Sequence, residues 1–301
     1  MFDILGLGAV AVDDLLYVEA FPLADAKMPV LRTERQCGGL TGTALVAGAR
    51  LGAKCAYAGV LGTDDFSAFA IERLRQEGID MTHLRQRPEG GPVHSVIVVD
   101  ESRHTRNIFF DASKALGADA QWPETNVIQS VRVLFVDNFG LDGMIRAARI
   151  ARATQIPVVA DFEGASGPRF TELLGLVDHL ILSQSFAQKL TGGSDPVAMA
   201  DLLWGKEREA VIITCGAEGC WYLARGGAVK HQPAYKVNVV DTTGCGDVFH
   251  GAYASTLARG LELTERLRFA SAAAALKATR PGGQAGIPTR PAVESFLQGM
   301  L

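Results

Sequence analysis

The sequence is poor in cysteine and offers no evident arrangement of metal ligands. Its five cysteines are an odd number, and no two of them have the Cys-x-x-Cys spacing. Most lie in apolar or glycine-rich surroundings, which favours reduced thiols over disulfides or a zinc site. The six histidines form no His-Glu-x-x-His pair. A disulfide-stapled scaffold and a zinc hydrolase of that kind are therefore excluded.

Clusters of like charge and long apolar runs are missing as well. The net charge is -4, Lys and Arg are scattered, and no block of five like charges occurs. This excludes the basic footprint typical of nucleic-acid binding. No apolar run approaches the roughly 20 residues that span a membrane, and the first residues do not resemble a signal peptide. We expect a soluble, cytoplasmic protein without nucleic-acid or membrane partners.

The chain is instead rich in apolar residues, arranged in a regular alternation of segment types. Hydrophobic residues make up 48% of its 301 residues, enough for a large core. Apolar runs at 131–136, 156–160 and 177–182 predict buried strands, and the segment 143–154 predicts a helix. This alternation predicts an α/β fold with a mostly parallel central sheet flanked by helices. No repeat or linker interrupts it, so residues 1–301 are expected to form a single domain.

Two segments break this alternation. Residues 15–36 resemble a hairpin, and the extended runs 93–99 and 105–110 are too close together for a helix between them. Together they predict a small, separate sheet of about four strands. We expect this sheet to be a lid over the ligand cleft, formed by approximately residues 14–36 and 92–111. Such a lid keeps water away from reacting groups.

Residues 241–252 combine glycines, carboxylates and the start of a helix. Gly244 and Gly246 lack a β-carbon, so the backbone can point several N–H groups at one spot. Amides at a helix N-terminus attract anions, and phosphate is the natural occupant. Asp247 falls in the first helical turn, where its simplest role is to offset the helix dipole, worth about 0.3–1 kcal/mol. The presence of a second acid nearby, Asp241, favours a site that binds charged groups over a simple helix start.

This combination predicts phosphoryl transfer, in a chain that lacks a Walker-type Gly-x-x-x-x-Gly-Lys-[Ser/Thr] loop. An aspartate beside a backbone anion site can take the proton of an attacking hydroxyl. The amides would stabilise the charge that develops on the transferred phosphate. Asp13, Asn138 and Asp161 are expected to converge on the same site, because open α/β sheets bind ligands at the carboxyl ends of their strands.

The N-terminal region suggests a different function. Residues 6–11 match the Gly-x-Gly-x-x-Ala fingerprint of dinucleotide-binding proteins. That fingerprint requires a helix directly after the glycines, yet residues 12–18 look extended. An NAD(P)-dependent oxidoreductase is therefore a weaker alternative. A catalytically silent sugar or nucleotide sensor is another, and the retention of Asp247 with both glycines argues against it.

Residues 241–251 closely resemble the Asp-Thr-x-Gly-Ala-Gly-Asp-x-Phe-x-Gly signature of ribokinase-like (PfkB) carbohydrate kinases. The resemblance covers the whole chain and includes Gly38, Gly39 and the helix expected after them. It implies a central, mostly parallel sheet flanked by helices, with a small β-sheet lid. It also implies an ATP-dependent kinase with Mg²⁺ that transfers the γ-phosphoryl group to a hydroxyl of a small sugar, a ketose or related sugar. A nucleoside kinase of the same fold is the nearest alternative.

The resemblance also assigns roles to individual residues. Asp247 would be the general base, and the anion hole would consist of Gly244, Cys245 and Gly246. The residues at the sugar would be Asp13, Gly38, Gly39 and Thr43. The residues at the nucleotide would be Ser183, Thr214, Gly216, Gly219 and Gly283. Asp241 and Thr243 match positions that bind a monovalent cation in ribokinases, which makes K⁺ a further expected cofactor, and Gly282–Gln284 resemble the loop near adenine and cation.

The chain departs from the family pattern at three points. Thr43 stands where relatives often have asparagine, and it can still hydrogen-bond a hydroxyl. Cys245 stands where many relatives have alanine, and it is small enough for the backbone amide to keep its role. The Asn-x-x-Glu motif associated with magnesium and phosphates aligns with residues 183–186, where the acid is absent. Asp161 or Glu163 is then the expected support for Mg²⁺.

The C-terminal third is most similar to sulfofructose kinases, through residues 231–237 and 280–288. This similarity implies an anionic sugar, and Lys27 is the residue expected to bind its charged group. Asn138 occupies a strand end where an arginine would suit such a substrate better, and Lys27 is equally compatible with an exposed lysine of the lid. The free edges of the lid strands predict a homodimer formed through the lid.

Overall fold

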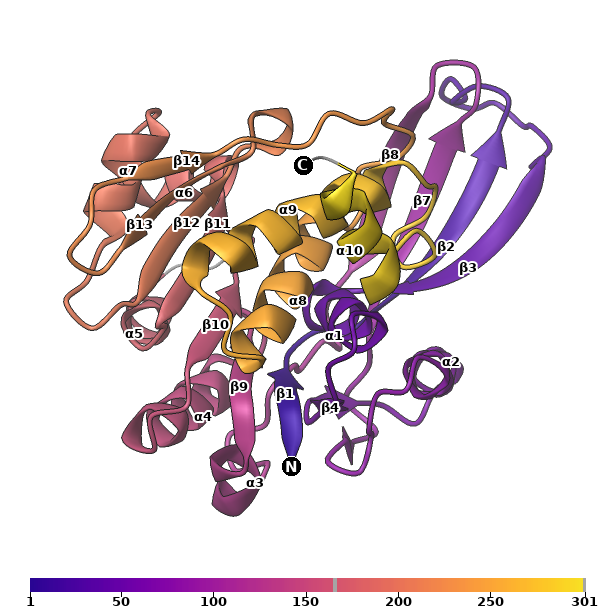
Figure 1. The fold of residues 1–301 in the computed structure, drawn as a ribbon. Helices are drawn as coiled ribbons and strands as arrows, with labels where there is room; N and C mark the ends of the chain where they lie inside the picture. Colours follow the sequence, from indigo (N-terminus) through magenta and orange to yellow (C-terminus); the bar gives the residue numbers. More distant parts are fainter. Residues whose placement is uncertain (165–166, 300–301) are drawn as a thin grey trace.

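The computed structural model describes residues 1–164 and 167–299, and its largest element is a sheet of eight strands (Figure 1). The strand order is β14-β13-β12-β11-β10-β9-β1-β4. The strands from β4 to β12 in this order are parallel, and β13 runs antiparallel to both of its neighbours, β12 and β14. Their bounds are β1 Phe2–Leu7, β4 Cys55–Tyr57, β9 Val131–Val136, β10 Val158–Asp161, β11 His179–Ser183, β12 Ala210–Thr214, β13 Cys220–Ala224 and β14 Lys230–Gln232. The predicted α/β class with a mostly parallel sheet is confirmed.

Helices cover both faces of this sheet. The helices on the first face are α1 Leu40–Arg50, α2 Asp65–Gln76, α8 Cys245–Ala258, α9 Leu263–Ala278 and α10 Arg290–Gln298. Those on the second face are α3 Thr125–Gln129, α4 Leu141–Ala153, α5 Pro168–Gly175, α6 Gln184–Thr191 and α7 Pro196–Leu203. Successive strand residues point to opposite faces, so Val133 and Phe135 enter the first core and Leu134 and Val136 the second.

A second sheet of four strands projects beyond the end toward which β1 points (Figure 1). Its order is β3-β2-β7-β8, with bounds β2 Ala11–Val18, β3 Arg32–Gly38, β7 Val93–Asp100 and β8 Thr105–Asp111. Both predicted hairpins are present, β2 with β3 and β7 with β8, and the parallel pairing of β2 with β7 joins them. A short pair, β5 Val60–Leu61 and β6 Arg85–Gln86, lies apart.

The glycines at residues 6–11 form the passage between the two sheets. β1 ends at Leu7 and β2 begins at Ala11, so a strand follows where the dinucleotide fingerprint requires a helix. The Tyr57 hydroxyl donates a hydrogen bond to the Gly8 carbonyl oxygen at 2.8 Å and holds this corner. The fingerprint is therefore a coincidence of sequence. No helix among the described residues is long and apolar enough to cross a membrane.

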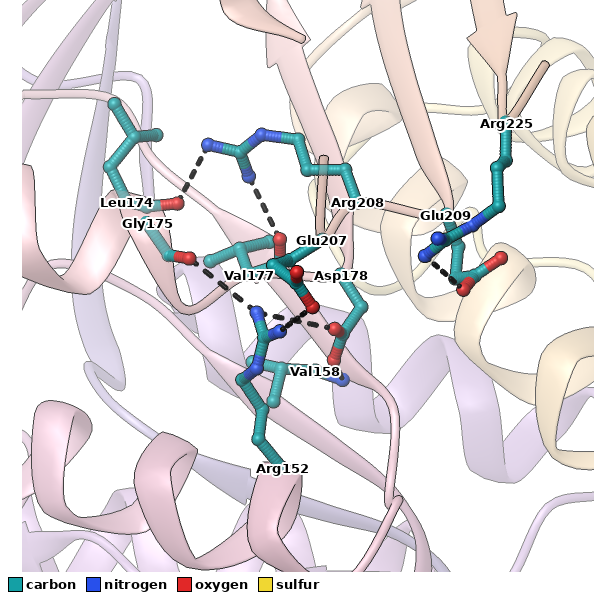
Figure 2. Close-up of polar contacts among 10 residues, drawn as sticks. All are labelled: Arg152, Val158, Leu174, Gly175, Val177, Asp178, Glu207, Arg208, Glu209 and Arg225. Carbon is teal, nitrogen blue, oxygen red and sulfur yellow. Dashed lines mark hydrogen bonds and ion pairs between the residues drawn. The ribbon is translucent and has the colours of Figure 1, made fainter. Parts of the chain in front are cut away.

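Arginine side chains form hydrogen bonds and ion pairs at the amino ends of β10, β11 and β12, as Figure 2 shows. Arg208 is 7% exposed and donates to the carbonyl oxygens of Val177 at 2.8 Å and Leu174 at 2.7 Å. Arg152 lies beside Asp178, with 3.5 Å between the charged atoms. A surface hollow of about 320 Å³ lies here, and another of about 470 Å³ beside it contains Arg132 and Arg259. Both lie at the edge opposite the carboxyl ends of the strands and contain none of the predicted site residues.

Candidate active site

Helix α8 places Asp247 at the carboxyl edge of the main sheet. The helix begins after Gly244, whose φ of 75° is in the left-handed region that favours glycine. Asp247 lies in the first turn, and its carboxyl group contacts that of Asp161, the last residue of β10. α8 packs directly on α1 through Gly251, so the N-terminal ends of both helices reach the same edge.

The start of α8 presents amides without protein acceptors. Within residues 1–164 and 167–299, no acceptor is found for the N–H groups of Gly244, Gly246 or Asp247. The space where Gly246 would carry a β-carbon is open, with nothing within 4 Å. The Cys245 thiol instead points to α9 and donates to the Ala274 carbonyl oxygen at 3.6 Å. The Cys245 amide donates to the Thr242 carbonyl oxygen at 3.2 Å. The amides of Gly244, Gly246 and Asp247 are therefore the ones able to bind an anion.

The acids at this helix start form a close pair. Burial, and next the charge of Asp161, raise the pKa of Asp247 well above its usual value. The pKa of Asp161 is also raised, by burial first and then by the charges of Glu163 and Asp137. A carboxylate with a raised pKa is a better proton acceptor for a hydroxyl than an ordinary surface aspartate. The arrangement is therefore suited to a general base.

His250 supports this pair from one turn further along α8. Its Nδ1 lies 2.8 Å from the Gly246 carbonyl oxygen and 3.3 Å from Asp161 Oδ2. Its Nε2 lies 3.1 Å from the carbonyl oxygen of Ile181 in β11. Burial lowers the pKa of His250, while hydrogen bonds to both carbonyl oxygens oppose that shift. The sequence analysis missed this residue, although its place three positions after Asp247 on the same helix was a usable signal.

The residues expected at the sugar lie where the two sheets meet. Asp13 on β2 pairs with Gln36 on β3, and its carboxylate reaches toward the diagonal neighbour Gly38, where a β-carbon would lie 2.7 Å from Asp13 Oδ2. Burial raises the pKa of Asp13, against a hydrogen bond with Ser95 that lowers it. Gly38 thus keeps the Asp13 carboxylate uncovered. Lys27, by contrast, is exposed in the loop between β2 and β3.

Gly39 and Thr43 both make contacts within the protein that explain these residue types. Gly39 precedes α1 with a φ of 88°, and a β-carbon there would lie 2.6 Å from the Ala11 amide nitrogen. Its close approach is therefore to the chain's own backbone. Thr43 is 2% exposed, and its hydroxyl accepts a hydrogen bond from Gln284 Nε2 at 3.3 Å. These two residues position α1, and their contact with a sugar remains a prediction.

The residues expected at the nucleotide gather at the carboxyl ends of β11 and β12. Ser183 and Thr214 are paired neighbours at the ends of these strands. Gly216 has a φ of 57° and open space around it, which suits the approach of a ligand. Gly219 is instead packed against its own chain, since a β-carbon there would lie 2.1 Å from the Gln232 carbonyl oxygen. Gly283 lies beside the start of α8, its carbonyl oxygen 3.2 Å from where a Gly244 β-carbon would be.

Asp241 and Thr243, the expected cation ligands, bind each other. Asp241 Oδ1 accepts from the Thr243 amide at 2.9 Å and the Thr243 hydroxyl at 2.7 Å. Oδ2 accepts from the Gly282 amide at 2.9 Å. Burial alone would raise the pKa of Asp241, but these hydrogen bonds and the charge of Lys277 outweigh it and lower the pKa. Arg106 on β8 reaches the same carboxylate at 3.4 Å and connects the small sheet to this loop.

The buried acid directly after β9 is Asp137, the residue before Asn138. Asp137 accepts hydrogen bonds from the Ala9 amide at 2.7 Å, the Thr41 hydroxyl at 2.9 Å and the Phe139 amide at 2.8 Å. Burial raises the pKa of Asp137 to about 7, although these hydrogen bonds oppose the shift. It fastens the passage from β1 to α1. That Asn138 faces the site stays a prediction; its Oδ1 accepts a hydrogen bond from the Glu163 amide at 3.3 Å.

The acids present fit a magnesium ion that is bound together with phosphates. Among the described residues no group of three or more His, Cys, Asp or Glu side chains could hold a metal by itself. Asp161 Oδ2 is buried beside Asp247 and, within the described part of the chain, has no hydrogen-bond partner; His250 Nδ1 lies 3.3 Å from it. Mg²⁺ is commonly held by one or two carboxylates plus substrate phosphates. Asp161 would support the ion in that way, whereas Glu163 is exposed and its amide donates to Asn138 Oδ1 at 3.3 Å.

Comparison with known proteins identifies the family. The model described as "pfkB family carbohydrate kinase" matches residues 1–290. The chain belongs to this family. It is 29% identical over 299 residues to the ribokinase of Haemophilus influenzae, with 97% of each chain covered. It is 22% identical over 320 residues to 5-dehydro-2-deoxygluconokinase of Shouchella clausii, covering 99% of this chain and 96% of the relative.

The structure of Arabidopsis thaliana ribokinase complexed with ribose and ATP has the same fold. Its TM-score to this chain is 0.87, at 23% identity and with 99% of each chain covered. The fold inferred from the resemblance in residues 241–251 is thus confirmed. As a pfkB-family carbohydrate kinase, the chain is a phosphotransferase that acts on a sugar hydroxyl and uses ATP with Mg²⁺.

Proposed function

We propose that this pfkB-family kinase transfers the γ-phosphoryl group of ATP to a hydroxyl of a small sugar, with Asp247 as the general base. The observation that carries the proposal is the start of α8. There a carboxyl group with a raised pKa lies one turn from amides that have no acceptor in the described part of the chain. A base and an anion site in one turn are the two groups that phosphoryl transfer to an alcohol requires.

Each group has a defined task in this reaction. Asp247 takes the proton of the attacking hydroxyl, a contribution of about 10²- to 10⁴-fold. The amides of Gly244 and Gly246 stabilise the charge on the transferred phosphate without reorganising. Ser183, Thr214 and Gly216 bind the nucleotide along the neighbouring strand ends, which supports in-line placement of its phosphates. Mg²⁺ supplies further positive charge at the phosphates.

The sugar binds between Asp13 and Asp247, under the small sheet. Asp13 offers carboxylate oxygens to sugar hydroxyls, and Gly38 leaves that face open. Arg106 links β8 to the loop of Asp241, which supports a lid role for residues of about 14–36 and 92–111. We propose a pentose of the ribose type as first candidate and a ketose as second, because ribokinase is among the relatives.

The test is ADP release from Mg-ATP against a panel of ribose, ketoses, sugar acids, sulfosugars and nucleosides. Saturable turnover on one or more neutral sugars is the expected result. Preference for a sulfosugar or a sugar acid would assign Lys27 or another cation to an anionic group. Preference for nucleosides, or no turnover on any compound while ATP still binds, would contradict the proposal.

We also propose that the kinase is a homodimer formed through the edge of the small sheet. β8 is an edge strand, and three consecutive side chains on it are exposed: Ile108 by 51%, Phe109 by 58% and Phe110 by 71%. A long apolar edge invites pairing with another strand, and a second copy offers the same edge. The free thiols suit the cytoplasm, where we propose the enzyme acts.

A further inference from the structure

A fully buried lysine lies directly behind the proposed anion site. Lys277, in the last turn of α9, is 0% exposed, and its Nζ donates a hydrogen bond to the Asp241 carbonyl oxygen at 2.8 Å. Lysine is almost never fully buried unless its charge is compensated. The acidic groups around it are Asp241, Asp247 and the Cys245 thiol, and Arg106 is the nearby cation. One positive charge is therefore built into the loop that leads to Asp247.

The Asp241 oxygens that could hold a separate cation in this loop are already hydrogen-bonded within the chain. The Asp241 carboxylate accepts from Thr243 and from the Gly282 amide, and the Asp241 carbonyl oxygen accepts from Lys277. In the adjoining loop, Arg50 Nη1 donates to the carbonyl oxygens of Gln284 at 2.8 Å and Ile287 at 3.1 Å. K⁺ at these atoms would have to share them with the donors they already have, and at the Asp241 carbonyl oxygen it would be repelled by the positive charge of Lys277. The residues present therefore do not fit the monovalent cation that the resemblance implies for Asp241 and Thr243.

We propose that the Lys277 ammonium takes the place of a bound monovalent cation, so that this kinase needs no K⁺. The proposal rests on the function proposed above, in which residues 244–247 bind the transferred phosphoryl group. K⁺ and an ammonium group each bring one positive charge. The ammonium group is covalently attached, so its presence does not depend on the salt concentration as that of bound K⁺ does. Its charge lies close to the phosphate site in a partly buried region, where salt screens electrostatic interactions only weakly.

Lys277 also fixes the shape of the loop. The amides of Val240 and Asp241 donate to the carbonyl oxygen of Ala278 at 2.8 and 3.1 Å, so the stretch before the anion site is tied to the end of α9. With the Asp241 carbonyl held by Lys277, the same residue is fastened through its backbone and its carboxylate. We therefore assign Lys277 a positioning and electrostatic role, not a catalytic one.

The first experiment uses the unmodified protein and no sugar. Mg-ATP affinity and melting temperature are measured in KCl, NaCl and choline chloride at equal ionic strength. We expect the dissociation constants to agree within about twofold, because no site takes up the cation. Tightening of about fivefold or more in KCl relative to choline chloride, or a melting temperature that rises specifically with K⁺, would overturn the proposal.

The second experiment replaces the charge. Lys277→Met keeps the length of the side chain, and we expect Mg-ATP binding to weaken by about tenfold, the loss of one charged interaction. Lys277→Ala leaves room, and K⁺ but not choline is expected to restore part of its affinity. Lys206→Met, at an exposed position in the loop after α7, is the matched control and should bind as the unmodified protein does. Unchanged affinity in both Lys277 variants would refute the role.

These readouts separate the two proposals. Nucleotide binding and melting do not require phosphorylation of a sugar, so an enzyme inactive on every sugar would still report on Lys277. If the Lys277 variants do not fold, the salt comparison on the unmodified protein decides the question alone. If the protein binds no nucleotide, the proposed function fails, and the melting temperatures in the three salts still show whether K⁺ binds.

Discussion

Gly251 on α8 and Ala44 on α1 touch through their backbones: a β-carbon at position 251 would lie 2.1 Å from the Ala44 carbonyl oxygen. This contact sets the distance between the two helices whose N-termini carry Asp247 and the Gly39 turn. Gly251→Ala should force the helices apart and lower the free energy of unfolding by about 1–3 kcal/mol. Urea unfolding measures the change. Gly175→Ala, where no described residue lies within 4 Å of the added carbon, is the control, and an equal effect in both variants would refute the packing argument.

Removal of the proposed base should abolish turnover without affecting the fold. Asp247→Asn keeps the shape of the side chain but cannot accept the hydroxyl proton, so turnover should fall by at least about 100-fold. Mg-ATP binding, measured by calorimetry, should remain. Asp201→Asn, at an exposed position of α7, should have normal turnover. If Asp247→Asn kept turnover within a few-fold of the unmodified enzyme, Asp247 would not be the base.

The long periodic segments were predictable because their own residues determine them. The helix expected at 143–154 is α4, Leu141–Ala153, and the hairpin strands expected at 93–99 and 105–110 are β7 and β8. Helices α5, α6 and α7 did not emerge from the pattern. Each has eight residues, too few for a clear period, and such short helices depend on packing against the sheet for stability.

The residues of the candidate site also fall into those that the sequence predicts and those that it does not. Asp247, Gly244 and Gly246 were recognisable because base and amides lie within one helical turn of the sequence. Lys277 and His250 were not, because their partners are remote: Asp241 lies 36 positions from Lys277, and Ile181 lies 69 from His250. A buried lysine in an alanine-rich helix looks like a surface residue until the fold places a carbonyl oxygen against it.

The proposed dimer predicts that one charge on β8 should release monomers. Phe110→Lys puts a charge on the exposed edge, where it would lie at the interface between two copies. Sedimentation velocity should then show a monomer where the unmodified chain forms a dimer. Leu202→Lys alters an equally exposed apolar residue, 67% exposed on α7, and should leave the dimer intact. A monomer for the unmodified chain at all concentrations would exclude the lid interface.

Acid should destabilise the fold through His179, the first residue of β11. Its Nδ1 lies 3.0 Å from the Tyr253 hydroxyl, which itself accepts from Arg266 Nη1 at 3.1 Å. Burial, and then the charge of Arg266, lower the pKa of His179 to about 3. The unfolded chain, with a histidine pKa near 6.5, binds the proton first. The stabilising contribution is therefore complete above about pH 6.5 and is lost as the pH falls toward 3, by about 1.4 kcal/mol per pH unit.

The variant His179→Asn isolates this contribution, because asparagine keeps an acceptor for the Tyr253 hydroxyl but cannot take up a proton. Urea unfolding at about pH 7 and about pH 5 should show a loss of roughly 2 kcal/mol in the unmodified protein beyond that of the variant. His104→Asn is the control, since His104 is exposed and its φ of 53° is one that asparagine tolerates. If His179→Asn loses as much stability between the two pH values as the unmodified protein, the acid sensitivity arises elsewhere.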